Sequence, residues 1–165
     1  MRLLCILLLF ILPGLLRAQT DSFTVYFFLL EDCKITQAYT DKMQEIYREY
    51  AGDSIGFVGY FPNPVSEDST IQDFKNKYQL PFNCTRTDAY AKAKGFGVQI
   101  TPEVVLYNET RKTLLYQGRI DNMYERVGQR RRVVTSHELA AALYAIRNAQ
   151  PVPIPKTNAI GCFFR

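Results

Sequence analysis

The sequence has one histidine, four cysteines and a small net charge, and each scarcity argues against a class of function. The formal charge is +4, and +2 without Arg2 and Arg17, which is too small to indicate nucleic acid or an acidic membrane as a partner. His137 has no closely spaced cysteine beside it, so we expect no metal and no other cofactor. The one basic cluster, Arg126 with residues 130–132, shows no helical or strand period and indicates a solvated loop.

The apolar stretch at the start of the chain is too short to cross a membrane. Arg2 supplies a positive beginning, residues 3–12 form the apolar run, and Leu16-Arg17-Ala18 resembles a signal-peptidase site. We therefore predict a signal peptide over residues 1–18 and an exported protein, periplasmic or secreted, with no membrane anchor after cleavage. Disulfide bonds persist in such compartments.

Three cysteines remain once Cys5 leaves with the signal peptide: Cys33, Cys84 and Cys162. An odd number means that at least one thiol stays free or pairs only transiently. Thr36 stands three residues after Cys33, where a second cysteine would complete a Cys-x-x-Cys loop. Fast resolution within such a loop is therefore excluded.

Cys33 is placed between a predicted strand and a predicted helix. It follows the apolar run of residues 23–30 and precedes side chains spaced as on one helical face, with Asp32 as the expected N-cap. Backbone N–H groups of a first helical turn favour a thiolate, whereas the charges of Glu31 and Asp32 oppose it by a similar ~0.3–1 kcal/mol. We expect a moderately activated nucleophile; the alternative is a buried, inert thiol.

Apolar periodicity predicts alternating strands and helices. The expected strands cover residues 23–30, 54–61, 82–87, 103–107 and 113–116, and the expected helices cover 33–51, 69–80, 89–94 and 135–146. Ser69 with Gln72, and Thr135 with Glu138, match the capping-box pattern, and Gly95 is expected to close the third helix. Crossover helices favour parallel pairing and the late hairpin is antiparallel, so we predict a single α/β domain with a helix-covered mixed sheet.

This order, with a cysteine at the first strand–helix junction and Thr101-Pro102 before the hairpin, resembles the thioredoxin fold over residues 21–150. It is most similar to the redoxin branch of thiol-specific antioxidant and thiol–disulfide proteins. Dispersed motifs resemble those of exported bacterial thioredoxin-like proteins that carry a Cys-Pro-Ile-Ser-type motif. They are Cys33-Lys-Ile-Thr36, Tyr116-Gln-Gly-Arg-Ile-Asp121 with Tyr124, Thr135-Ser-His-Glu-Leu139, and the tail Pro151-Val-Pro…Thr157…Gly161-Cys162.

The resemblance implies a substrate groove formed by Thr36, Thr101 and Pro102. Most X–Pro bonds are trans, but in thioredoxin-like folds this proline is cis and packs against the active cysteine. Its neighbour presents backbone groups to which an extended substrate adds as a strand. Three further residues are candidates for an ion-paired, supporting corner near the tail: Arg119, Asp121 and Tyr124.

Residues 151–165 are expected to form an extended tail that packs back on the domain. At about 3.1 Å per residue, the Pro-rich stretch from Pro151 to Cys162 spans on the order of 30 Å, and Gly161 permits close backbone approach. Cys162 could thus return to Cys33 and act as its resolving thiol. The alternatives are pairing with Cys84, or no disulfide bond.

The leading functional prediction is an exported thiol–disulfide oxidoreductase with Cys33 as the nucleophile, resolved by Cys162 or an external thiol. Its partners would be a protein or small-molecule disulfide or thiol substrate and a thiol electron donor. One alternative is a non-enzymatic binding module whose thiols are structural or hold a metal with His137. The other is an atypical peroxidase, although Leu30 stands where peroxidatic relatives carry a threonine.

Overall fold

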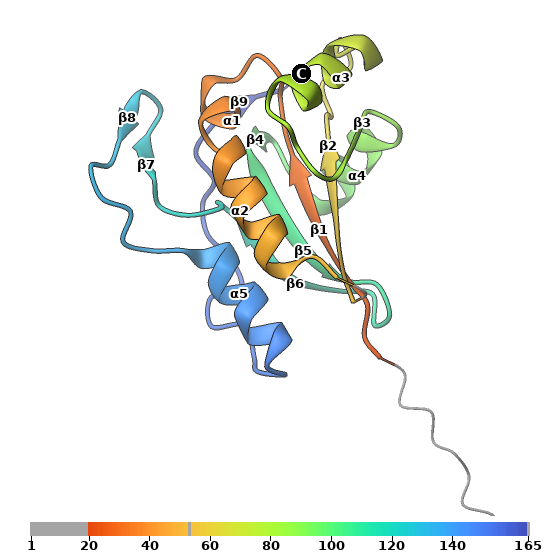
Figure 1. The fold of residues 1–165 in the computed structure, drawn as a ribbon, viewed down its shortest axis with the longest axis vertical. Coiled ribbons are helices and arrows are strands. Elements are labelled where there is room, and N and C mark those ends of the chain that lie inside the picture. Colours follow the sequence, from red (N-terminus) through yellow and green to blue (C-terminus); the bar gives the residue numbers. More distant parts are fainter. Residues whose placement is uncertain (1–19, 53, 165) are drawn as a thin grey trace, which may run out of the picture.

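The computed structural model describes residues 20–52 and 54–164, so the predicted signal peptide lies outside the described residues. A five-stranded sheet in the order β3-β2-β1-β5-β6 forms the centre of the molecule (Figure 1). Its strands are β1 (Phe23–Phe28), β2 (Ile55–Tyr60), β3 (Asn83–Thr85), β5 (Glu103–Asn108) and β6 (Thr113–Gly118).

The central strand β1 explains why its sequence is almost continuously apolar. It pairs in parallel with β2, Phe23 opposite Ile55, and antiparallel with β5, Phe23 opposite Asn108. Phe27 and Phe28 point to opposite faces of the sheet, and both are 0% exposed. Because β2 and β3 are parallel while β5 and β6 form an antiparallel hairpin, the predicted mixed sheet is confirmed.

Helices cover both faces of this sheet in three layers (Figure 1). They are α1 (Lys34–Ala38), α2 (Thr40–Tyr50), α3 (Asp68–Lys77), α4 (Ala89–Phe96) and α5 (Glu138–Arg147). Phe27 packs on the side of α2, α3 and α5, whereas Phe28 packs on the side of α4. Within the described part of the chain, no helix is both long enough and apolar enough to cross a membrane.

The helix expected over residues 33–51 is divided into α1 and α2 at Tyr39. This residue ends α1 and precedes α2, and its buried hydroxyl donates a 2.8 Å hydrogen bond to Asp121 Oδ1. Cys33, and not Asp32 as predicted, is the N-cap of α1. The cysteine therefore precedes the first helical turn, and Tyr39 ties the helix pair to a distant loop.

The capping box predicted for Ser69 and Gln72 is wrong, because the helix begins earlier. Glu67 is the N-cap of α3, its side chain accepts from the backbone of Thr70, and the Thr70 hydroxyl accepts from the Glu67 N–H at 3.2 Å. Gln72 instead donates to Asn76 one turn later.

The capping box predicted for Thr135 and Glu138 is also wrong. α5 begins at Glu138 with His137 as its N-cap, and the Glu138 carboxylate binds an arginine. The preceding N–H groups of Thr135 and Ser136 donate to Asn122 Oδ1 at 3.0 and 3.2 Å. Asn122, 13 residues before Thr135, therefore accepts from the N–H that the predicted capping box assigned to Glu138.

Two smaller boundaries differ from expectation. α4 continues past Gly95 and ends before Gly97, whose φ of 70° is the left-handed conformation typical after a helix. The basic segment is solvent-exposed as predicted, but it contains a short hairpin of β7 (Tyr124–Arg126) and β8 (Gln129–Arg130).

The C-terminal tail is extended and runs back along the domain. The Gln117 N–H of β6 donates to Pro155 O at 3.0 Å, and the Thr157 N–H donates to Gln117 O at 2.9 Å. The tail ends as β9 (Cys162–Phe163), which pairs with β4 (Ile100–Thr101) beside α1 (Figure 1).

Candidate functional site

Cys33 lies beyond the carboxyl end of the central strand, at the start of α1. Its N–H donates to Leu30 O at 3.2 Å, and its carbonyl accepts from the Gln37 N–H at 3.0 Å. These bonds fix the backbone that presents the thiol. The residue is only 2% exposed, so the sulfur is covered in this conformation.

The Thr101-Pro102 peptide bond is cis, as the resemblance implied. It lies beside the cysteine, because the Cys33 thiol donates to Thr101 O at 3.5 Å. Thr101 and Pro102 are both buried. The loop between α4 and β5 therefore brings a carbonyl oxygen directly to the sulfur.

The tail brings Cys162 to the same place. Cys162 stands opposite Thr101 in the antiparallel β4–β9 pair, and the Thr101 hydroxyl donates to Cys162 O at 3.3 Å. The side chains of Cys162 and Cys33 lie close enough for Cys33 to raise the pKa of Cys162. All three cysteines of the described residues are free thiols. The fold thus brings two free thiols together beside a cis-proline.

Cys162 is held in its protonated form. Burial and the hydrogen bond and charge of Cys33 raise the pKa of Cys162 to about 12, and the charge of Asp32 acts in the same direction.

Because the pKa of Cys162 is raised, we expect its reactive thiolate to form only at strongly alkaline pH. Thiolates are the species that react with iodoacetamide, so labelling of Cys162 in the reduced chain should still be rising at about pH 10. The cysteine of a free peptide with the sequence of residues 157–165 should already be near its plateau there. Mass spectrometry of the labelled peptides gives both rates. Identical titration curves would contradict the assigned contact with Cys33.

Cys84 is not part of this pair. It lies on the edge strand β3, and its sulfur is 3.9 Å from Phe82 O. Burial raises the pKa of Cys84 to about 12, partly offset by the charge of Lys75. The sequence alone allowed a disulfide bond to Cys84. In the structure Cys84 lies on β3, whereas Cys33 and Cys162 both lie at Thr101.

The predicted groove of Thr36, Thr101 and Pro102 is closed. Thr36 is 0% exposed on the inner side of α1, and its Oγ1 has no hydrogen-bond partner among the described residues. Thr101 is also 0% exposed, because β9 lies along β4. The chain's own tail therefore covers the place where the groove was expected.

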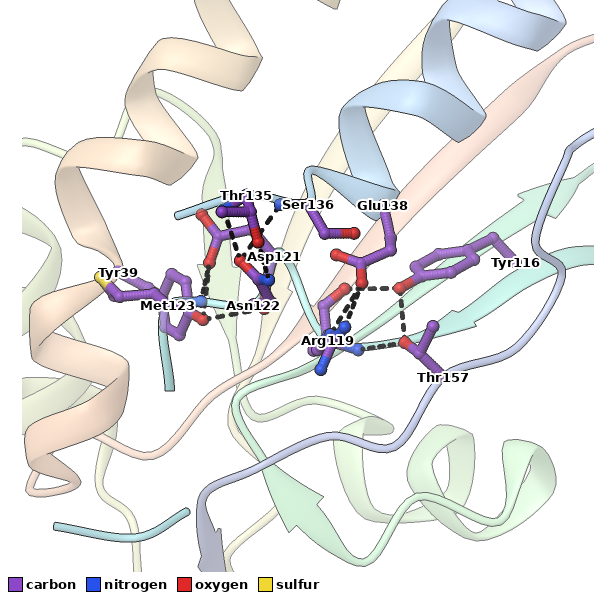
Figure 2. Close-up of polar contacts among 10 residues, drawn as sticks. All are labelled: Tyr39, Tyr116, Arg119, Asp121, Asn122, Met123, Thr135, Ser136, Glu138 and Thr157. Carbon is purple, nitrogen blue, oxygen red and sulfur yellow. Dashed lines mark hydrogen bonds and ion pairs between the residues drawn. The ribbon is translucent and has the colours of Figure 1, made fainter. Parts of the chain in front are cut away.

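A partly buried network around Arg119 anchors the tail (Figure 2). Arg119 Nε donates to Glu138 Oε1 at 2.9 Å, and its Nη2 contacts the same oxygen. The Arg119 N–H donates to Thr157 Oγ1 at 3.1 Å, and this hydroxyl lies 2.8 Å from the Tyr116 hydroxyl. Tyr116 in turn donates to Arg119 O. Arg119 is ion-paired near the tail as predicted, but its partner is Glu138.

Asp121 and Tyr124 belong to a second cluster behind the site. Asp121 Oδ1 accepts from the Tyr39 hydroxyl and from the Met123 N–H, both at 2.8 Å (Figure 2). The ring of Tyr124 lies 5.9 Å from that of Tyr39. Asp121 is therefore a hydrogen-bond acceptor that fixes the junction of α1 and α2, and it is not the ion-pair partner of Arg119.

Glu138 and Thr157 were not predicted as members of the site. Glu138 matched a capping pattern, and Thr157 drew attention only as part of the resembling tail. The sequence signal that could have indicated the role of Thr157 was a threonine in the tail together with Gly118 at the end of β6. At Gly118, where φ is 150°, a Cβ would lie 2.1 Å from Thr157 Oγ1. The close approach of tail and strand requires glycine there.

Gly118→Ala should therefore loosen the tail and destabilise the domain. Because the added methyl group must displace Thr157, we expect a loss of about 1–3 kcal/mol in the free energy of unfolding. Urea denaturation measures it. Gly95→Ala is the matched control, since Gly95 is exposed on α4 and an added methyl group there would meet no other part of the chain within 4 Å. A loss no larger than in the control would refute this anchoring.

The described residues offer no third ligand for a metal at the two thiols. No group of three or more His, Cys, Asp or Glu side chains among them is arranged to hold a metal ion. His137 caps α5 and does not join Cys33 and Cys162 in such a group.

No protein-family model and no curated protein matches the sequence. Solved structures do. The chain is similar to an uncharacterized conserved protein from Geobacillus kaustophilus, with 22% identity, 88% of this chain and 77% of the other covered, and a TM-score of 0.73. A hypothetical protein from Sinorhizobium meliloti 1021 gives 22% identity, 86% and 78% coverage, and a TM-score of 0.70.

A secreted disulfide oxidoreductase of Mycobacterium tuberculosis is also similar, with 20% identity, 75% and 81% coverage, and a TM-score of 0.52. Identities this low establish the fold alone. Together with the strand order and the cis-proline, they show that the chain is a single thioredoxin-like domain.

Proposed function

We propose that this protein is a thiol–disulfide oxidoreductase in which Cys33 is the nucleophile and Cys162 the resolving thiol. The observation that carries the proposal is that Thr101, next to cis Pro102, accepts from the Cys33 thiol and pairs with Cys162 in the β4–β9 strand pair. A disulfide oxidoreductase of similar fold supports the same class of chemistry. The substrate is a protein or small-molecule disulfide, and an external dithiol regenerates the reduced chain.

The first step is attack by the Cys33 thiolate on one sulfur of the substrate disulfide. The substrate S–S bond breaks, a mixed disulfide forms on Cys33, and the other substrate sulfur leaves as a thiolate. Cys162 keeps its proton at neutral pH because of its raised pKa, and it lies beside the reacting sulfur. Once Cys33 is bound in the mixed disulfide it carries no charge that raises the pKa of Cys162, so the proton of Cys162 can pass to the departing thiolate.

The second step is attack by the resulting Cys162 thiolate on Cys33 Sγ. The mixed disulfide breaks, the second substrate sulfur leaves, and a Cys33–Cys162 disulfide forms. In total the substrate disulfide gains two electrons from the protein dithiol and one proton from Cys162; the second leaving thiolate takes up from water the proton that Cys33 released on ionising. Run in reverse, the same steps oxidise a dithiol substrate.

We further infer that the protein is exported and belongs with the bacterial proteins whose Cys-Pro-Ile-Ser-like motif and Gly-Cys tail it resembles. The N-terminal pattern of residues 1–18 supports export. The tail supports the likeness, because Gly161 and Cys162 meet the active-site loop at Thr101.

Catalysed exchange tests the proposal in both directions. One assay follows reduction of insulin disulfides by dithiothreitol, and the other follows oxidation of a dithiol peptide by oxidised glutathione. The chain without residues 1–18 should accelerate at least one of them over the uncatalysed rate. A Cys84→Ser variant should act like the native chain, and no acceleration in either direction would refute the proposal.

A further inference from the structure

Strand β9 occupies an edge that would otherwise be open to another polypeptide. Its partner β4 is only two residues long, and β4 belongs to no other sheet in the described residues. The register places Ile100 opposite Phe163 and Thr101 opposite Cys162. An extended segment carrying a cysteine is therefore already seated with its sulfur at Cys33.

We propose that this edge recognises an extended protein segment of the pattern Gly-Cys-x-Phe, and that the chain's own residues 161–164 are a built-in competitor for it. The inference rests on the proposed function for the fate of the cysteine. The recognition itself needs only backbone pairing and shape, as in other cases of strand addition.

The requirement for glycine comes from a very close backbone approach. A Cβ built on Gly161 would lie 2.0 Å from Thr101 O and 3.0 Å from Ile100 Cγ2. Real Cβ atoms do not come so near to a carbonyl oxygen, and both contacts belong to the edge that any incoming strand would meet. The site therefore excludes side chains at the position before the cysteine.

The requirement for an aromatic residue comes from Phe164. Its side chain packs against the cluster under α4 that contains Phe28, Val98 and Val105. Phe163 points the other way, is 72% exposed, and leaves its position free in the pattern. A pocket of about 400 Å³ is lined by these two aromatic residues together with Tyr90, Lys94, Gly97, Val98 and Gln99.

The anchored tail explains why the edge stays closed. Thr157 is fixed by the Arg119 network only a few residues before Gly161. A short tether keeps its end at an effective concentration in the mM range, so a free segment at micromolar concentration competes poorly. A partner protein gains access when the tail is released, and Cys162 resolves the mixed disulfide when the tail docks again.

The test uses the full chain with the tail released by Gly161→Ala. The probe is a fluorescein-labelled peptide with the sequence of residues 158–164, in which serine replaces cysteine so that no disulfide can form. Fluorescence anisotropy should show at least about tenfold tighter binding to the Gly161→Ala chain than to the native chain. The same peptide with alanine in place of its glycine should bind at least about tenfold more weakly.

A second variant guards against failure of the first to fold. Phe164→Ala removes the aromatic anchor and should also increase peptide binding, while Gly95→Ala should behave like the native chain. Equal binding to native and released chains, no binding to either, or equal binding of the alanine peptide would overturn the proposal. So would a tail-exchanged dimer of the Gly161→Ala chain in light scattering, which would assign the edge to a second copy. Because the probe has no thiol, these outcomes are independent of the exchange assays.

Discussion

Cys33→Ser is expected to abolish thiol–disulfide exchange, with a loss on the order of 10³-fold or more. A serine hydroxyl does not ionise at neutral pH and cannot form the mixed disulfide. Cys162→Ser should have a different effect, because Cys33 can still attack but nothing resolves the product. That variant should accumulate a mixed disulfide with glutathione, visible as one glutathione adduct in the intact mass.

Cys84→Ser provides the matched control for both variants, because it removes a half-buried thiol on the edge strand β3 and leaves the pair in place. It should retain native exchange rates. Residual activity of Cys33→Ser comparable to the native chain, or a glutathione adduct mapped to Cys84 in the Cys162→Ser chain, would show that the nucleophile is not Cys33.

Arg119→Met should be the most destabilising single change considered. The Glu138 side chain is 3% exposed and its second oxygen has no hydrogen-bond partner among the described residues. Removing the arginine leaves a buried, unpaired carboxylate, which costs about 3–5 kcal/mol of unfolding free energy. Urea denaturation at neutral pH measures the loss. The double variant Arg119→Met/Glu138→Leu should recover most of it, because it buries no charge.

The ion pair of Arg119 and Glu138 also predicts how the stability of the domain changes with pH. Burial would raise the pKa of Glu138, but hydrogen bonding from Arg119 outweighs it and the pKa lies below its ordinary value. The native pair thus contributes stability above the ordinary carboxyl pKa, and this contribution is lost as pH falls through the lowered value. The Arg119→Met chain lacks this contribution, so a fall in pH should no longer lower its stability through Glu138. Equal acid dependence of both chains would contradict the pairing.

The central sheet was predictable because its strands carry strong local patterns. The apolar run at residues 23–30 is β1 with both faces buried, and the segments flanking residues 108–112 form the β5–β6 hairpin. The cis bond before Pro102 was not predictable from local preference, since trans is the usual isomer. It followed from the resemblance.

The parts that sequence reasoning missed depend on contacts between distant residues. Tyr39 divides the first helix through a bond to Asp121, 82 residues away. Glu138 has its partner 19 residues earlier, so the local capping pattern was misleading. Closure of the groove by β9 depends on where an irregular tail docks, and neither periodicity nor propensity specifies docking.

Peptide mapping of the oxidised chain shows which cysteines form the redox pair. The reduced protein is incubated with oxidised glutathione, free thiols are blocked with a mass tag, and tryptic peptides are analysed without reduction. We expect one disulfide-linked peptide pair that joins Cys33 to Cys162, with Cys84 carrying the tag. Tags on all three cysteines, or a bridge that includes Cys84, would contradict it.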